Sequence, residues 1–388
     1  MSYSIDIYSF FSGIGFLDLG FETSGYQVVF ANELSEPFSE GYLYSREQMN
    51  MSLPTHGVNI KSAADYLLNT NDIAFLTEKI VYSRLQNNLV AFIAGPPCPD
   101  FSAGGKNRGR KGDKGRLTEN YVELIEFYSP DIFLFENVKG LWRTKKHRAF
   151  YEEMKKRVIA SGYVLTDKLI NAIEYGTPQD RDRIILFGFK NQLIDRLGYS
   201  DHVNMGHLED GFFPWSSFTH YKRENVFSLD WPDVDEYEEN VSRKMPSNVP
   251  IELTVEYWFE KNNVEKHFNQ QHHFMPRAGL ARFQTVAEGD MSKKSYKRLH
   301  RWRYSPTVAY GNNEVHVHPY KPRRLSVAEA LSIQSLPKDF ELPASMTLSA
   351  MFKGIGNGVP FLAARGLAKS IQYFLRREIN GCQTIEHE

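Results

Sequence analysis

The first half of the chain alternates short apolar runs with segments whose apolar residues repeat at helical spacing. The apolar runs cover residues 5–11, 26–31, 56–60, 89–94, 131–135 and 183–189. Helical patterns lie between them, for example at 119–128 and 150–160. Such alternation is typical of an α/β fold in which a mostly parallel sheet carries helices on both faces. Because ligands of these sheets bind at the carboxyl ends of the strands, the residues after each run are candidate site residues.

The alternation is lost near residue 193. From 193 to 321 the sequence is rich in aromatic, His, Asn and charged residues without a clean period, which indicates a separate, irregular lobe. Ser326 and Glu329 then have the spacing of a helix capping box, and a long amphipathic helix is expected over 360–377. We therefore predict three parts: 1–192, the irregular lobe at 193–321, and 322–388.

A glycine-containing loop, Phe11-Ser12-Gly13-Ile14-Gly15, follows the first apolar run. Glu33 ends the second run, twenty residues after Gly13, where an acid can accept hydrogen bonds from a ribose diol. The loop lacks the third glycine of the dinucleotide fingerprint, because Asp18 stands at that place. This spacing favours S-adenosylmethionine, a phosphate-free adenosine ligand, over NAD. A tight turn followed by a surface Glu remains the alternative.

Cys98 follows the stiff turn Gly95-Pro96-Pro97 at the end of a predicted buried strand. A single cysteine is usually a small buried hydrophobic residue. Here a basic, glycine-rich stretch at 104–115 follows at once, and nearby cations favour the nucleophilic thiolate. The sequence therefore indicates Cys98 as a candidate nucleophile.

Polar residues also accompany the two later strands. Glu136 ends the run at 131–135, where parallel pairing would place it beside Cys98 as an acid or hydrogen-bond donor. Arg181 and Arg183 precede the run at 184–189, and strand alternation points them to the same side. Either arginine could hold an anionic oxygen, or both could be solvated surface residues.

Taken in order, these motifs resemble the carbon-5 DNA cytosine methyltransferases of bacterial modification systems. The resemblance covers about residues 5–190 and 305–375. It includes the loop at 11–15, Glu33, Pro97-Cys98, Phe101-Ser102 with the stretch 105–116, Glu136-Asn137-Val138, Gln179-x-Arg181-x-Arg183, Arg324-Leu325-Ser326 with Glu329 and Gln334, and Gly356-Asn357-Gly358-Val359. The ordered set is specific, although each string alone is common.

The resemblance implies a Rossmann-like S-adenosylmethionine-dependent methyltransferase domain with a smaller target-recognition domain at 193–321. The C-terminal part, 322–388, would return to the catalytic domain. The implied cofactor-binding residues are Phe11, Ser12, Gly13, Ile14, Gly15, Glu33, Leu34, Asn59, Ile60, Pro97, Asn357 and Val359. S-adenosylhomocysteine would be the product.

The resemblance also implies a mechanism. Cys98 would add to carbon 6 of a cytosine that has been flipped out of the duplex, so that carbon 5 can accept the methyl group. Glu136 would contact ring nitrogen 3. Arg183, supported by Arg181, would hold the ring oxygen at position 2. The stretch that begins at Phe101 would close over the base.

Double-stranded DNA is the implied partner, and a cognate restriction endonuclease or another defence-system protein stays open. The net charge of −1 argues weakly against nucleic acid, but basic residues crowd the stretches 106–116 and 293–303. The expected DNA contacts are Ser102, Lys106, Arg108, Arg277, Arg298 and Arg301. With two cysteines, no apolar run of membrane-spanning length and no signal-peptide pattern, a reducing cytoplasmic location without a membrane is expected.

Two positions depart from the family pattern: Pro99 stands where Gln is usual, and Asn59 where Asp is usual. Asn59 keeps a carbonyl acceptor for the adenine amino group. The rival interpretations are RNA methylation, a non-catalytic nucleic-acid-binding relative and a dehydrogenase. The long lobe disfavours RNA methylation. The presence of Cys98, Glu136 and Arg183 disfavours a non-catalytic relative, and the glycine spacing disfavours a dehydrogenase. No metal site is expected, because the histidine pairs lack matching Cys or acidic partners.

Overall fold

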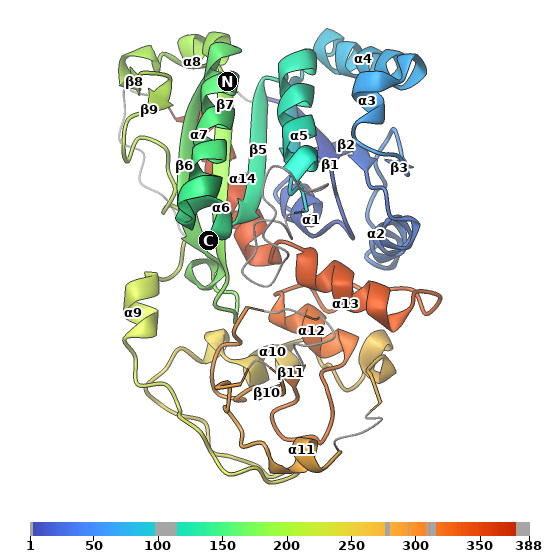
Figure 1. Ribbon diagram of the computed structural model, residues 1–388, viewed down its shortest axis with the longest axis vertical. Helices are drawn as coiled ribbons and strands as arrows, with labels where there is room; N and C mark the ends of the chain where they lie inside the picture. The colour runs from blue at the N-terminus through green and yellow to red at the C-terminus, as the bar shows by residue number, and fades with distance from the viewer. Residues whose placement is uncertain are drawn as a thin grey trace.

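The fold consists of a sheet-containing domain and a smaller lobe (Figure 1). A computed structural model describes residues 3–97, 115–275, 280–293, 295–307, 310 and 316–377. Among these residues, one sheet has nine strands in the order β3-β2-β1-β4-β5-β7-β6-β9-β8. The strands are β1 (Ile5–Phe10), β2 (Gln27–Asn32), β3 (Val58–Asn59), β4 (Leu89–Ala94), β5 (Ile132–Val138), β6 (Tyr163–Asn171), β7 (Asp182–Lys190), β8 (Val203–Asn204) and β9 (His207–Leu208).

The five strands β3-β2-β1-β4-β5 pair in parallel, so their carboxyl ends meet at one edge of the sheet. Strand β7 runs antiparallel to both β5 and β6. Every residue of β1 and β4 is buried, because helices cover both faces of the sheet. The predicted mostly parallel α/β fold is therefore confirmed.

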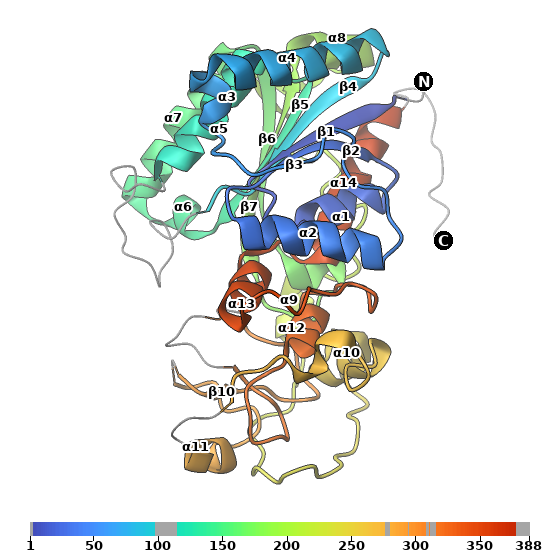
Figure 2. The ribbon, with the colours of Figure 1, turned by 90° about the vertical axis from the view of Figure 1, so that its right-hand side faces the viewer.

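Helices lie on both faces of the sheet (Figure 2). An apolar core lies between the sheet and each group of helices. One core contains residues of α1 (Phe16–Glu22), α8 (Asn191–Leu197) and α14 (Phe361–Arg376). The other contains residues of α3 (Asp65–Leu68), α4 (Thr70–Leu85), α5 (Gly115–Tyr128) and α7 (Lys145–Ala160). Because α14 packs in the same core as α1, the C-terminal segment rejoins the domain in which the chain begins.

The sheet domain extends beyond the predicted boundary at 192. Strand β9 pairs with β6, and Phe213 and Trp215 pack against the core that contains α8 and α14. Residues 193–215 therefore lie with the sheet. The irregular lobe begins after them.

The lobe has short elements and small apolar clusters, as its lack of sequence period predicts. The elements are α9 (Arg223–Phe227), α10 (Val255–Lys261), α11 (Leu280–Thr285), β10 (Lys297–Arg298) and β11 (His316–Val317). Among the described residues, the 3-10 helices are η2 (Ala172–Tyr175), η3 (Ser200–His202), η4 (Ile251–Leu253) and η5 (Phe268–Gln271). Buried ion pairs supplement the apolar packing, for example Arg301 Nε to Glu288 Oε1 at 2.8 Å.

Helices α12 (Val327–Ile333) and α13 (Leu348–Asn357) lie at the junction of lobe and sheet domain (Figure 1). The capping box is confirmed: Ser326 N donates to Glu329 Oε2 at 2.7 Å, and Glu329 N donates to Ser326 Oγ at 3.3 Å. Gln334, just after α12, donates to the carbonyl of Ile355 in α13 at 2.6 Å. Helices α2 (Glu36–Gln48) and α6 (Gly140–Arg143) complete the described set. None of these described helices combines the length and the apolar character needed to cross a lipid bilayer.

Candidate active site

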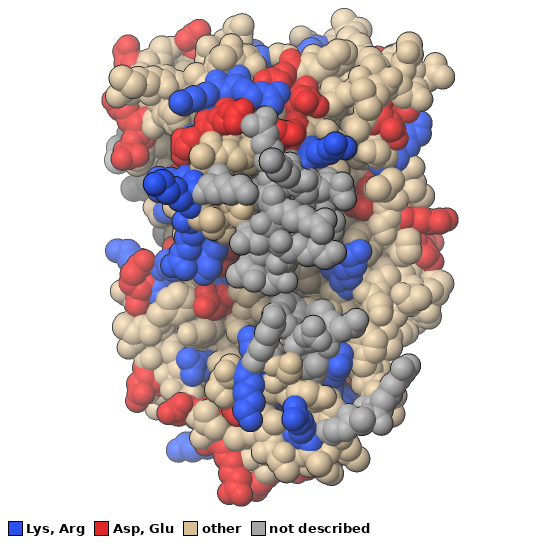
Figure 3. Space-filling model, in the orientation of Figure 1, with Lys and Arg blue, Asp and Glu red and all other residues tan. Residues whose placement is uncertain are grey.

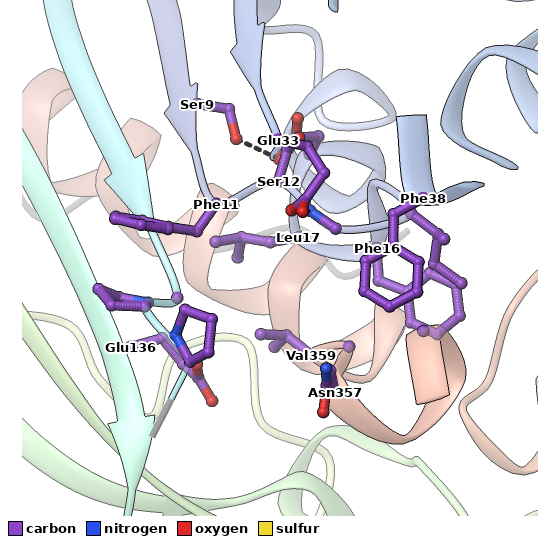
Figure 4. A pocket seen from close by; sticks show the side chains of 18 of the residues that line it. Ser9, Phe11, Ser12, Phe16, Leu17, Glu33, Phe38, Glu136, Asn357 and Val359 are labelled. Carbon is purple, nitrogen blue, oxygen red and sulfur yellow. Dashed lines mark hydrogen bonds between the residues drawn. The ribbon is translucent and has the colours of Figure 1, made fainter. Parts of the chain in front are cut away.

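A cavity of about 390 Å³ lies at the carboxyl ends of β1, β2, β4 and β5. Ten predicted site residues line it: Phe11, Ser12, Gly13, Ile14, Glu33, Pro97, Glu136, Arg183, Asn357 and Val359. Figure 4 shows Glu33 and Glu136 separated by the apolar side chains of Phe11, Leu17 and Val359. One cavity therefore joins the predicted cofactor end to the predicted catalytic end.

The loop between β1 and α1 requires its glycines. Phe11, Gly13 and Gly15 have positive φ values of 53°, 58° and 81°. A Cβ atom at Gly15 would lie 2.6 Å from the Tyr42 ring and 2.8 Å from the Arg46 guanidinium. Gly15 therefore does not line the cavity itself but lets the loop pack closely on α2.

A buried arginine holds this loop from behind. Arg46 is fully buried and donates from Nη2 to the carbonyl of Gly15 at 2.6 Å. Its Nε donates to Glu22 Oε2 at 2.7 Å, and its guanidinium carbon lies 4.4 Å from the centre of the Tyr42 ring. No local pattern in the sequence indicates this cluster, because an Arg in an amphipathic helix is usually solvent-exposed.

Glu33 is fixed by backbone donors on both carboxylate oxygens. Gly13 N donates to Oε2 at 2.9 Å, and Ser35 N donates to Oε1 at 2.8 Å. Burial raises the pKa of Glu33, and these backbone donors oppose the rise. Each oxygen can accept more than one hydrogen bond, so the carboxylate can still receive the hydroxyls of a ribose.

The three remaining predicted cofactor residues flank Glu33 instead of lining the cavity. Glu33 N donates to the carbonyl of Asn59 at 3.1 Å, which joins the ends of β2 and β3. Asn59 Nδ2 donates to the carbonyl of His56 at 3.1 Å, which leaves its side-chain oxygen as an acceptor. The side chains of Leu34 and Ile60 are 66% and 51% exposed, so both are open to contact with a ligand.

At the other end of the cavity, Glu136 and Arg183 form an ion pair. Arg183 Nε lies 2.7 Å from Glu136 Oε1, and both side chains are largely buried. Strand β4 approaches so closely that a Cβ at Gly95 would lie 2.8 Å from Glu136 Oε2. The parallel pairing of β4 with β5 thus brings the turn before Cys98 to Glu136. Cys98 itself lies outside the described residues.

Arg181 does not line the cavity, which differs from its predicted place beside Arg183. Its guanidinium is buried, and Nη2 donates to the carbonyls of Gly356 and Gly358, each at 2.9 Å. Burial, together with the charge of Arg183, holds the pKa of Arg181 well below its usual range. Arg181 therefore anchors the segment that carries Asn357.

The cavity also contains polar residues to which the sequence analysis assigned no role in the site. Asp18 is fully buried and accepts a hydrogen bond of 2.7 Å from Ser9 Oγ. Burial, with the charge of Glu22, raises the pKa of Asp18 to about 7, although the Ser9 hydrogen bond opposes this. Ser9, a polar residue in the buried strand β1, was the available sign of a buried polar partner. Further lining residues of this kind are Asn137 and Lys353.

The residues that were expected to contact DNA divide into two groups. Ser102, Lys106, Arg108 and Arg277 lie outside the described residues. Arg298 and Arg301 are instead buried inside the lobe. Arg298 donates to the carbonyls of Val286 and His318 at 2.7 and 2.6 Å, and Arg301 pairs with Glu288. The guanidinium groups of Arg298 and Arg301 donate hydrogen bonds to acceptors within the lobe. The expectation that these two arginines contact DNA directly is therefore wrong. Within the described part of the chain, no group of three or more His, Cys, Asp or Glu side chains is placed to hold a metal ion.

Comparison with known proteins identifies the family. A family model for C-5 cytosine-specific DNA methylases matches residues 5–373. The Type II methyltransferase M.NmeDI of Neisseria meningitidis serogroup C is 52% identical over 381 residues, covering 97% of this chain and 86% of that protein. The Type II methyltransferase M.FnuDI of Fusobacterium nucleatum is 26% identical over 370 residues, covering 94% and 93%. The crystal structure of the S. pombe Dnmt2 methyltransferase shares the fold, with a TM-score of 0.58 at 12% identity and coverage of 95% and 98%. The chain therefore belongs to the C-5 cytosine-specific DNA methylase family.

Proposed function

We propose that this protein transfers the methyl group of S-adenosylmethionine to carbon 5 of a cytosine in a specific double-stranded DNA sequence. The observation that carries the proposal is the single cavity with Glu33 at one end and the Glu136–Arg183 pair at the other. A methyl donor and an acceptor ring must meet within reach of one another, and a shared cavity provides that proximity. Family membership supports the same reaction class.

The cofactor end has the groups that an adenosyl ligand requires. We assign Glu33 to the ribose hydroxyls and the side-chain oxygen of Asn59 to the adenine amino group. Leu34, Ile60 and the ring of Phe11 would contact the adenine faces and edges. The bound cofactor supplies an electrophilic methyl group on a sulfonium and leaves as the thioether S-adenosylhomocysteine.

The catalytic end has the groups that activate a cytosine. The Cys98 thiolate would form a bond to carbon 6, and the displaced electron pair would make carbon 5 nucleophilic. Glu136 would hydrogen-bond ring nitrogen 3 while Arg183 holds the oxygen at position 2, which stabilises charge as it develops. Carbon 5 then bonds to the methyl group. Loss of its proton to a base re-forms the ring double bond and expels the thiolate.

The lobe after residue 215 is the proposed target-recognition region. Carbon 5 of a stacked cytosine cannot reach this cavity, so the base must leave the duplex. The cavity binds one generic base, and flanking sequence must therefore be recognised elsewhere. Because relatives are named Type II methyltransferases, we propose a modification role in the cytoplasm beside a separate restriction endonuclease.

Bisulfite sequencing of plasmid DNA from cells that express the protein tests the activity, the base and the site together. We expect one short sequence to become fully methylated at one cytosine. Purified enzyme should then form a covalent adduct with a duplex that carries 5-fluorocytosine at that site, because fluorine cannot leave as a proton does. Cys98→Ala should abolish the adduct and keep cofactor binding, while Glu136→Gln should slow methylation strongly.

The controls separate this proposal from RNA methylation. Transfer RNA incubated under the same conditions should not be methylated. Methylation of RNA without DNA, or an adduct that persists in Cys98→Ala, would overturn the proposed substrate or the proposed nucleophile.

A further inference from the structure

Three exposed basic side chains lie just after the end of β5, the strand that carries Glu136. Val138 lines the cavity, α6 begins two residues later at Gly140, and α7 follows at Lys145. Arg143, Lys145 and Arg148 on these two helices are exposed, and we call them the basic strip. Figure 3 shows Lys and Arg side chains gathered over the region where Figure 1 places α6 and the start of α7.

The basic strip is joined to the edge of the active site. Lys139, at the start of α6, pairs with Asp182 at 2.5 Å between Nζ and Oδ2. Asp182 immediately precedes Arg183, which pairs with Glu136 in the cavity. A polymer that delivers a base to Glu136 and Arg183 would therefore pass close to the strip.

The charges of the strip are not neutralised within the described chain. No ion pair between described residues involves Arg143, Lys145 or Arg148. By contrast, Arg157 near the other end of α7 pairs with Glu126 at 2.5 Å. Because the whole protein has a net charge of −1, a local group of cations that form no ion pair with other described residues is not a consequence of overall composition.

The position of two of these cations, at the N-terminus of α7, lowers the stability of that helix. The first turn of α7 contains no acidic residue and includes Lys145 and Arg148. Cations are disfavoured at a helix N-terminus, because its unpaired backbone N–H groups already carry partial positive charge. Helix stability therefore does not explain why they are there, whereas an external polyanion would.

Aromatic packing fixes the direction of one cation of the strip, Arg148. The guanidinium carbon of Arg148 lies 4.7 Å from the centre of the Trp142 ring. Trp142 in turn packs edge-on against Tyr151, with ring centres 6.0 Å apart. A preorganised cation loses less conformational entropy when it binds a phosphate.

We propose that the basic strip binds the phosphate backbone of DNA that extends beyond the flipped base. This inference rests on the proposed function, which it deepens by adding a backbone contact surface on the sheet domain. The strip would strengthen binding to all sequences alike, because phosphate contacts position the protein and carry no sequence information.

The test is the triple variant Arg143→Gln, Lys145→Gln, Arg148→Gln. The matched control, Lys156→Gln, Arg196→Gln, Arg376→Gln, removes the same charge from exposed positions away from the cavity. Arg196 and Arg376 lie near Tyr3, at the amino edge of the parallel strands. The affinity of each protein for a short duplex of unrelated sequence is measured between about 50 and 200 mM salt.

The strip variant should show a salt slope smaller in magnitude by about one for each phosphate that it no longer binds. Its KM for plasmid DNA should rise at least tenfold while kcat at saturating DNA stays near the wild-type value. The control variant should keep the wild-type slope. Equal slopes in the strip variant and the wild type, or an equal decrease in the control variant, would overturn the proposal. A wild type that methylates no DNA would instead reject the proposed function.

Discussion

The main-chain N–H of Gly13 donates a hydrogen bond of 2.9 Å to Oε2 of Glu33. This bond joins the loop after β1 to the end of β2, so the acid fixes the loop while the loop orients the acid. Since Ser35 N occupies the other oxygen, the carboxylate is positioned before any ligand arrives. Preorganisation of this kind reduces the cost of binding, because the groups that contact the ligand are already ordered.

Glu33→Ala should weaken S-adenosylmethionine binding by about 1–3 kcal/mol, because hydroxyls and loop N–H groups lose their acceptor. Glu33→Gln is the matched variant: it keeps one carbonyl acceptor and should lose less. Isothermal titration calorimetry with the cofactor measures both. Equal affinity in Glu33→Ala and the wild type would place the ribose contact on another residue.

Arg181 and Arg183 should separate into two roles. Arg181 holds the carbonyls of Gly356 and Gly358, so Arg181→Ala should raise the dissociation constant for the cofactor about tenfold or more by releasing the segment around Asn357. Arg183 pairs with Glu136, so Arg183→Ala should lower kcat strongly and leave cofactor affinity within about twofold.

Calorimetry and single-turnover methylation give the two readings for each arginine variant. Arg181→Lys can reach one of the two carbonyls and should behave as an intermediate. If Arg181→Ala lowered kcat while cofactor affinity stayed unchanged, the anchoring role would be wrong.

Local sequence signals predicted much of the sheet because fully buried parallel strands are continuously apolar. They missed β6, whose central residues, such as Asp167 and Lys168, are only partly buried. Glu33 could be predicted because the spacing between two strand ends in a β-α-β unit is nearly fixed. Glu136 followed from the end of the neighbouring parallel strand. The site role of Arg183 was implied by the family resemblance instead, because β7 runs antiparallel to β5 and brings its amino end to the cavity.

Tertiary contacts could not be predicted from local patterns. Arg298 resembles any basic surface residue in sequence, yet its acceptors on Val286 and His318 lie twelve and twenty residues away. Arg46 and Gly15 are 31 residues apart, and their hydrogen bond depends on how α2 packs against the loop. Such burial depends on the folded lobe or core as a whole.

Asp18 should make stability depend on pH. Its pKa is raised from 3.8 to about 7, so folding favours the protonated form. The unfolded chain therefore releases this proton first, and the stabilisation is lost as the pH rises from about 4 to about 7. Asp18→Asn keeps an acceptor for Ser9 and removes the titration. Its free energy of unfolding relative to wild type should increase by about 2 kcal/mol from about pH 5.5 to about pH 8.5.

Urea unfolding at the two pH values measures this difference for Asp18→Asn. The exposed Asp201→Asn serves as the control and should show the same relative stability at both. A pH-independent effect of Asp18→Asn would mean that the carboxyl group is ionised in the folded protein.

The lobe should contain two kinds of basic residue. Arg298 is buried and donates to the carbonyls of Phe283, Val286 and His318, so Arg298→Ala leaves several buried acceptors without a donor. We expect it to lower the free energy of unfolding by about 3 kcal/mol or more. Arg282 and Lys293 are exposed, and their alanine variants should change stability by less than about 0.5 kcal/mol.

The exposed pair is where DNA effects should appear. Thermal unfolding separates the two kinds of residue, and bisulfite sequencing with salt-dependent DNA binding then gives the role of each exposed side chain. A phosphate contact would reduce the salt slope by about one and leave the methylated sequence unchanged, whereas a base contact would relax one position of that sequence. The assignment of target recognition to this lobe requires at least one such effect among exposed residues, because the proposed cavity would contact only the extruded base of the DNA. Two results together would contradict this division of the basic residues into buried structural ones and exposed DNA-contacting ones. The first is that Arg282→Ala and Lys293→Ala change neither the salt slope nor the methylated sequence. The second is that Arg298→Ala changes the methylated sequence without loss of stability.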